Sequence, residues 1–102
     1  MITSKQRAWL RGQANTIKPL LQIGKDGFSQ ETVRHADDLL RTRELVKIAV
    51  QKAAEETPRE LADLLSDKLS AEVVSVLGRK IVLYRHSKQL AEKGRSLILP
   101  RA

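Results

Sequence analysis

The tetrapeptide Gly24-Lys25-Asp26-Gly27 contains the residue types best suited to chemistry with an anion in this chain of 102 residues. Glycine has no side chain, so two glycines three positions apart allow unusual backbone angles and close approach to backbone N–H groups. Lys25 adds a positive charge at the same place. The segment therefore predicts a loop that can bind a phosphate group, provided that the carboxylate of Asp26 points away from it.

A plain turn between two elements requires the same flexible residues, and the pattern is short and common. The loop is not a Walker phosphate loop, because that motif has four residues between its first glycine and a Gly-Lys-Ser/Thr sequence that this chain lacks. Nucleotide hydrolysis is therefore not expected. From the residues alone, a phosphate-binding loop and a structural turn both remain open.

Basic residues near the C-terminal end form the second feature. The chain has a net charge of +7, but residues 52–72 carry −3 and residues 73–102 carry +6. Such a bias favours a polyanionic partner, which an acidic segment can help to orient. The alternative is a solvated edge hairpin that Lys and Arg protect from aggregation. The basic run comprises Arg79, Lys80, Arg85, His86, Lys88, Lys93 and Arg95.

Catalysis has little support in the sequence. There is no cysteine, and neither His35 nor His86 lies in a nucleophile or metal-binding motif. We therefore expect no enzymatic activity, metal, cofactor or small-molecule substrate. The lack of cysteine and of an apolar leader fits a cytoplasmic protein without membrane association. Aromatic residues are few, so we expect Trp9 in the core and Phe28 as a packing anchor, while Tyr84 fits either a buried or a stacking role.

Hydrophobic periodicity predicts the elements that position these residues in one domain. Capping boxes at Thr3 and Thr57 begin two helices, and Ser29 caps a third. The order αβαβαββ predicts an α/β fold with a four-stranded mixed sheet, whose first two strands are parallel and whose last two form a hairpin. The expected helices cover about 3–14, 29–40 and 57–69, and the expected strands cover 20–23, 44–50, 72–77 and 80–85.

Within these elements the apolar positions predict the core. We expect Ala8 and Trp9 to face it from the first helix, and Arg41-Thr42-Arg43 to link the second helix to its strand. On that strand Lys47 should project from the face opposite its apolar residues. No structure is predicted after Ser87. The apolar stripe of the helix over 57–69 comprises Leu61, Leu64, Leu65 and Leu69.

Three segments together, 20–27, 43–47 and 76–85, resemble the CRM domain family, the chloroplast RNA splicing and ribosome maturation module. The match is to its stand-alone bacterial YhbY-type members in particular. Order and spacing agree along nearly the whole chain. We therefore expect a single domain over residues 1–96 and a short C-terminal tail over residues 97–102.

The resemblance implies an α/β fold similar to the C-terminal domain of translation initiation factor three. It also implies RNA binding and, for the stand-alone bacterial type, association with rRNA in precursors of the large ribosomal subunit. The rival interpretation is a protein-interaction or structural module on ribosomal particles, and nothing in the sequence indicates an oligomeric state. The resemblance assigns RNA contact to Gly24, Lys25, Asp26 and Gly27, and charge and position add Arg43, Lys47, Arg79, Lys80 and Arg85.

Overall fold

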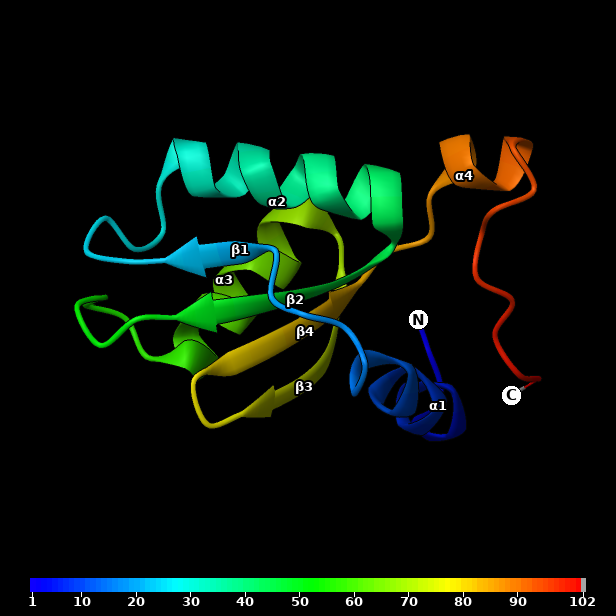
Figure 1. Cartoon of the computed structure of the whole chain (residues 1–102), viewed down its shortest axis with the longest axis horizontal. Coiled ribbons are helices and arrows are strands. Elements are labelled where there is room, and N and C mark those ends of the chain that lie inside the picture. Colours follow the sequence, from blue (N-terminus) through cyan, green and yellow to red (C-terminus); the bar gives the residue numbers. More distant parts are fainter. Residues whose placement is uncertain (102) are drawn as a thin grey trace.

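The computed structural model describes residues 1–101 and shows helices on both faces of one twisted sheet (Figure 1). The predicted order αβαβαββ is confirmed, and a short helix is added after the last strand. The elements are α1 Ser4–Ala14, β1 Leu21–Ile23, α2 Gln30–Arg43, β2 Leu45–Val50, α3 Pro58–Leu69, β3 Glu72–Leu77, β4 Lys80–Tyr84 and α4 Lys88–Glu92.

The sheet has the spatial order β1-β2-β4-β3. Strands β1 and β2 are parallel, and β4 is antiparallel to both β2 and β3, so the predicted four-stranded mixed sheet is confirmed. The hairpin turn at Gly78, where φ is 58°, returns the chain so that β4 lies between β2 and β3. Both β2 and β4 are therefore central strands.

Each face of the sheet has its own apolar core. Helices α2 and α3 cover one face, where Ile48 and Leu83 from the sheet meet Leu40 and Leu65 from the helices. Helix α1 lies on the other face, where Leu10 packs among a second, smaller set of buried residues. That second set comprises Ile2, Leu10, Ala14, Leu45, Val74, Val82 and Tyr84.

Both predicted capping boxes are confirmed. The Thr3 hydroxyl accepts the Gln6 N–H at 3.1 Å, and the Thr57 hydroxyl accepts the Glu60 N–H at 3.1 Å. In return the Glu60 carboxylate accepts the Thr57 N–H at 2.8 Å. This backbone hydrogen bond to Thr57 stabilises the ionised form and lowers the pKa of Glu60 below its usual value.

Two expectations for the core were wrong in detail. On α1, Ala8 is exposed, because Leu10 and Ala14, four residues apart, form the face toward the sheet. Trp9 is half-buried and packs against the second core, as expected. On α3, Leu64 is 41% exposed and Ala62 is buried in its place. The buried positions are Leu10 and Ala14 on α1, and Leu61, Ala62 and Leu65 on α3.

The junction between α2 and β2 also differs from the prediction. Helix α2 continues through Arg43, and β2 begins at Leu45 rather than at Glu44. Glu44 ends the helix with φ at 67°, and its side chain is fully buried. Its carboxylate accepts hydrogen bonds at 2.7 Å from Ser87 N, Ser96 Oγ and Leu97 N, which fixes the segment after β4 against the end of α2.

Candidate functional site

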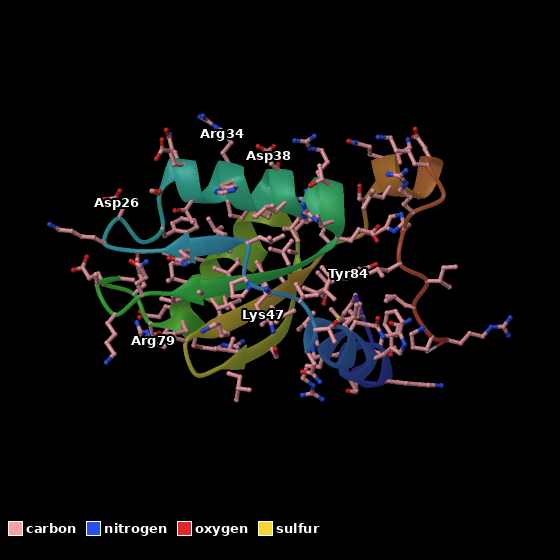
Figure 2. All side chains as sticks on the ribbon, in the orientation of Figure 1. Asp26, Arg34, Asp38, Lys47, Arg79 and Tyr84 are labelled. Carbon is pink, nitrogen blue, oxygen red and sulfur yellow. The ribbon has the colours of Figure 1, made fainter. Side chains whose placement is uncertain are left out.

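The glycine loop lies where β1 ends and α2 is about to begin. The Gly27 N–H donates to the Gly24 carbonyl at 3.0 Å and closes the predicted turn. Ser29 caps α2 as expected, since its hydroxyl accepts the Thr32 N–H. Lys25 and Asp26 are exposed at the tip of the loop, at the end of the molecule where Figure 2 labels Asp26. The loop therefore presents a lysine to solvent beside the positive end of a 14-residue helix.

The second glycine has a structural explanation that is independent of any ligand. Gly27 is buried with φ at 54°, and a Cβ there would lie 2.0 Å from Glu56 Oε1. A Cβ on Gly24 would lie 2.8 Å from Gln51 Oε1, the end of a flexible side chain that can move. Glycine at position 27 is therefore favoured both by its left-handed backbone angle and by the Glu56 carboxylate, which would have to move, whereas at position 24 only the Gln51 side chain would have to move.

Glu56 also occupies one of the backbone N–H groups that were expected to bind a phosphate. Its Oε2 accepts the Phe28 N–H at 3.3 Å, while the Gly27 N–H is engaged within the turn. Its Oε1 is buried and has no hydrogen-bond partner among residues 1–101. An acidic group therefore already lies against the loop, and a bound anion would meet fewer free N–H groups than the glycine pattern suggested.

Phe28 packs against the core beneath α2 and anchors the loop, as predicted. His35 is exposed on α2. A pocket of about 270 Å³ lies between β1, the loop and the first turns of α2. Its lining includes Lys25 but also Asp26 and Glu31, so the pocket itself is not strongly positive.

Of the supporting basic residues, the structure brings Lys47 and Lys80 together. Lys47 lies opposite Val82 in the sheet, and Lys80 lies two residues before Val82 on the same face of β4. Strand β2 ends, and strand β4 begins, at the end of the sheet nearest the glycine loop. Both side chains face α1, and that helix adds Arg11 to the same surface.

Arg79 has a structural role in the hairpin. Its guanidinium donates to the carbonyls of Val50 and Gln51, each at 2.8 Å, and so ties the hairpin turn to the end of β2. It lies near the glycine loop, at the same end of the molecule as Asp26 in Figure 2. Its N–H groups are thus partly used before any ligand arrives.

Arg43 and Arg85 lie at the opposite end of the sheet from the loop. Arg43 is exposed at the C-terminal end of α2. Arg85 follows β4, and its guanidinium pairs with Asp37 at 2.8 Å and donates to the Leu69 carbonyl. The basic run of the sequence is therefore divided between the two ends of β4 and does not form one continuous track.

Sequence reasoning did not identify Arg11 or Glu56. Arg11 lies in the last turn of α1, where a basic residue commonly interacts with the helix dipole, so its position gave no functional signal. Glu56 directly precedes a strong helix start and was indistinguishable from other acids of that segment. Only the tertiary fold places them beside Lys47 and Gly27, respectively.

Tyr84, whose role was left open, is buried beneath α1. Burial raises the pKa of its phenol above the ordinary value of 10.0, and the nearby Glu44 charge raises it further. Residues 1–101 contain no group of His, Asp and Glu side chains arranged to hold a metal ion. No helix in this part of the chain has the length and apolar character needed to cross a bilayer.

These features define a class of small α/β protein in which a mixed sheet presents a glycine-flanked lysine loop and exposed basic residues. The model of the CRS1/YhbY (CRM) domain matches residues 2–85, and the chain belongs to this family. The predicted family is thereby confirmed. The family is an RNA-binding domain rather than a class of enzyme.

Individual relatives agree with this assignment. The chain is 34% identical to the "Probable RNA-binding protein YqeI" of Bacillus subtilis, over 87% of this chain and 93% of that protein. It is 38% identical to the "Probable RNA-binding protein MJ0652" of Methanocaldococcus jannaschii, over 90% of this chain and 72% of that protein. The solution structure of SAV1595 from Staphylococcus aureus superposes with a TM-score of 0.79 at 40% identity, covering 98% of this chain and 100% of that one.

Proposed function

We propose that this chain is a non-catalytic, cytoplasmic RNA-binding protein that contacts rRNA in precursors of the large ribosomal subunit and assists their assembly. The names of its relatives support RNA as the partner. The choice of rRNA rests on the resemblance to the stand-alone bacterial members of the family. The excess of positive charge supports a polyanionic partner, whether that partner is rRNA or another RNA.

The observation that carries the proposal is the exposed Lys25 at the N-terminal end of α2. Lys25 forms no ion pair within residues 1–101, although Asp26 is its neighbour. The helix dipole and the ammonium group attract the same phosphate. Because the N–H groups of Gly27 and Phe28 are already engaged, we assign the contact to the Lys25 side chain rather than to a cradle of loop amides.

The variant Lys25→Glu tests the loop. Reversing a charge that contacts phosphate should lower the affinity for an rRNA fragment by about tenfold or more, with an unchanged circular dichroism spectrum. The matched control is Lys68→Glu, which makes the same charge change on the exposed surface of α3. If both variants bind as tightly as the unmodified protein, the loop is not part of the RNA-binding site.

Nuclease treatment of ribosomal fractions tests the partner. An RNA-binding protein should leave particles of the large subunit when accessible RNA is digested. A protein-interaction module should stay bound to the proteins that remain. Crosslinking in cells, followed by sequencing of the attached RNA, should recover rRNA of the large subunit, and recovery of other RNAs alone would contradict that part of the proposal.

A further inference from the structure

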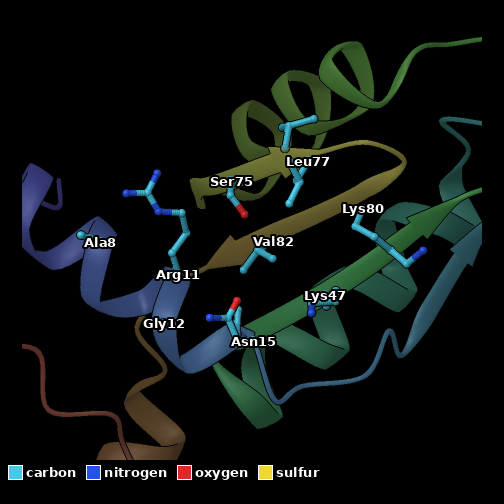
Figure 3. A pocket seen from close by; sticks show the side chains of 11 residues that line it. Ala8, Arg11, Gly12, Asn15, Lys47, Ser75, Leu77, Lys80 and Val82 are labelled. Carbon is cyan, nitrogen blue, oxygen red and sulfur yellow. The ribbon is translucent and has the colours of Figure 1, made fainter.

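A groove between α1 and the sheet lies outside the glycine loop. Helix α1 covers only part of its face, because its buried residues Leu10 and Ala14 contact the sheet near Leu45 and Tyr84. Toward the other end the same face is open, and a space of about 510 Å³ separates the helix from β2, β4 and β3 (Figure 3). This volume is within the range of about 300–1,000 Å³ that small-ligand pockets usually have.

Strand register decides which side chains enter this groove. Lys47, Val82 and Ser75 form one row across the sheet. Lys80 and Leu77 belong to the next row, nearer the glycine loop. Because side chains alternate between faces, all five project toward the α1 side. Figure 3 shows Lys47 and Lys80 on neighbouring strands, with Arg11 on the helix.

The groove has an unbalanced positive charge. Arg11, Lys47 and Lys80 line it, and no Asp or Glu is among the lining residues. None of the three forms an ion pair within residues 1–101, whereas four other arginines are paired with carboxylates. No acidic side chain in the groove offsets these charges, so an anion there would meet unmatched positive charge.

The usual structural reasons for surface lysines do not explain Lys47 and Lys80. Lysine protects exposed edge strands from aggregation, but both residues lie on central strands with partners on each side. Lys47 is only half-exposed and sits beside the apolar core under α1. The face toward α1 is therefore apolar where the helix covers it and polar where it is open.

We propose that this groove binds a single-stranded segment of RNA, which deepens the proposed function and rests on it. Phosphates would meet Arg11, Lys47 and Lys80. Leu77, which is 80% exposed, offers an apolar surface for a nucleobase at the rim. A positively charged groove that follows the backbone is one part of the arrangement by which proteins bind single strands, and Leu77 takes the place that aromatic side chains usually have there. The convex surface of an RNA duplex fits the concave space poorly.

Fluorescence anisotropy with a labelled single-stranded RNA of mixed sequence tests the groove. The double variant Lys47→Gln/Lys80→Gln should bind at least about tenfold more weakly than the unmodified protein, because neither side chain can then neutralise a phosphate. The matched control Lys68→Gln/Lys93→Gln removes the same charge from exposed positions away from the groove, and should change affinity less than about threefold. Equal losses of affinity in the two double variants would overturn the groove and leave RNA binding intact.

A second variant guards against misfolding, since Lys47 is partly buried. Arg11→Gln alters an exposed helical residue and should weaken binding about threefold with an unchanged circular dichroism spectrum. Normal affinity in this variant would contradict the proposal. A duplex of the same sequence should bind more weakly than the single strand, and tighter duplex binding would overturn the choice of occupant. If the unmodified protein binds neither RNA, the proposed function itself fails.

Discussion

The glycine loop and the α1 groove lie toward the same end of the sheet, yet they differ in how far their polar groups are already engaged. In the loop, the Gly27 and Phe28 amides have internal partners, and the Glu56 carboxylate packs against the backbone. In the groove, three cationic side chains have no acidic neighbour among the lining residues. The loop is thus shaped largely by its own contacts, while the groove retains unmatched charge.

The glycine pair and the basic residues therefore differ in what their sequence patterns indicate about function. A glycine pair attracts attention because it permits backbone exposure, but at Gly27 the left-handed backbone angle and the contact with Glu56 already favour glycine without any ligand. Arg11, Lys47 and Lys80 are far apart in the sequence, but the fold gathers them in one groove. The comparison predicts that changes in the loop act mainly on stability, except at Lys25, and that changes in the groove act mainly on affinity.

The largest expected effect on stability is that of Gly27→Ala. The left-handed backbone angle and the contact with Glu56 should together lower the free energy of unfolding by about 2–3 kcal/mol. Gly12→Ala is the matched control, because an added Cβ there meets no atom within 4 Å, and alanine should stabilise α1 by about 0.5–1 kcal/mol. Urea denaturation measures both. Unchanged stability of Gly27→Ala would remove the steric explanation for this glycine.

The second-largest expected effect is on the salt dependence of RNA affinity, which should differ between variants of the glycine loop and variants of the α1 groove. Each lysine that no longer neutralises a phosphate of a single strand lowers the slope of log affinity against log salt by about 0.7. Lys47→Gln/Lys80→Gln should therefore reduce the slope by about 1.4, and Lys25→Gln by about 0.7. Titrations between low and moderate salt give these slopes. A larger reduction for the loop variant would mean that the loop contributes more to binding than the groove.

Glu56→Gln should have a smaller effect, in the opposite direction. The amide oxygen can still accept the Phe28 N–H, but the negative charge beside the loop is removed, so RNA affinity should rise about two- to threefold. Glu55→Gln removes an exposed charge from the adjacent position and serves as the control. If both variants gain equally, only the total charge of the protein matters and the loop has no local role.

The smallest effect, absent at neutral pH, concerns Tyr84 at the covered end of the groove face. Burial and then the Glu44 charge raise its pKa, so the folded state favours the neutral phenol. The stability that this provides is complete below pH 10 and is lost as the pH rises through the folded-state pKa. Tyr84→Phe should show a weaker loss of stability in alkaline urea titrations, and parallel curves for the two proteins would contradict this assignment.

Local patterns in the sequence were sufficient to predict most of the elements. Thr3 with Gln6, and Thr57 with Glu60, define helix starts through hydrogen bonds between residues three positions apart. The Gly78 turn and the alternation along β2 are equally local. Such contacts are decided by neighbouring residues, so a single sequence contains the information required to recognise them.

Other features depend on residues far apart in the chain. The insertion of β4 between β2 and β3 is what places Lys80 beside Lys47, and no local pattern determines that order. The split of the basic run is different, because it follows from the extent of β4 alone, with Arg79 and Arg85 at opposite ends of that strand. The contact between Gly27 and Glu56 joins two segments that only the completed sheet brings together.

The buried carboxylate of Glu44 binds the segment after β4 to the rest of the domain through hydrogen bonds. The domain model stops at residue 85, yet all three groups that donate to this carboxylate at 2.7 Å come from Ser87, Ser96 and Leu97. A chain shortened after Arg85 would lose all three donors and, with them, the contacts that hold the segment after β4 against the end of α2. Residues beyond the range matched by the family model therefore take part in the fold.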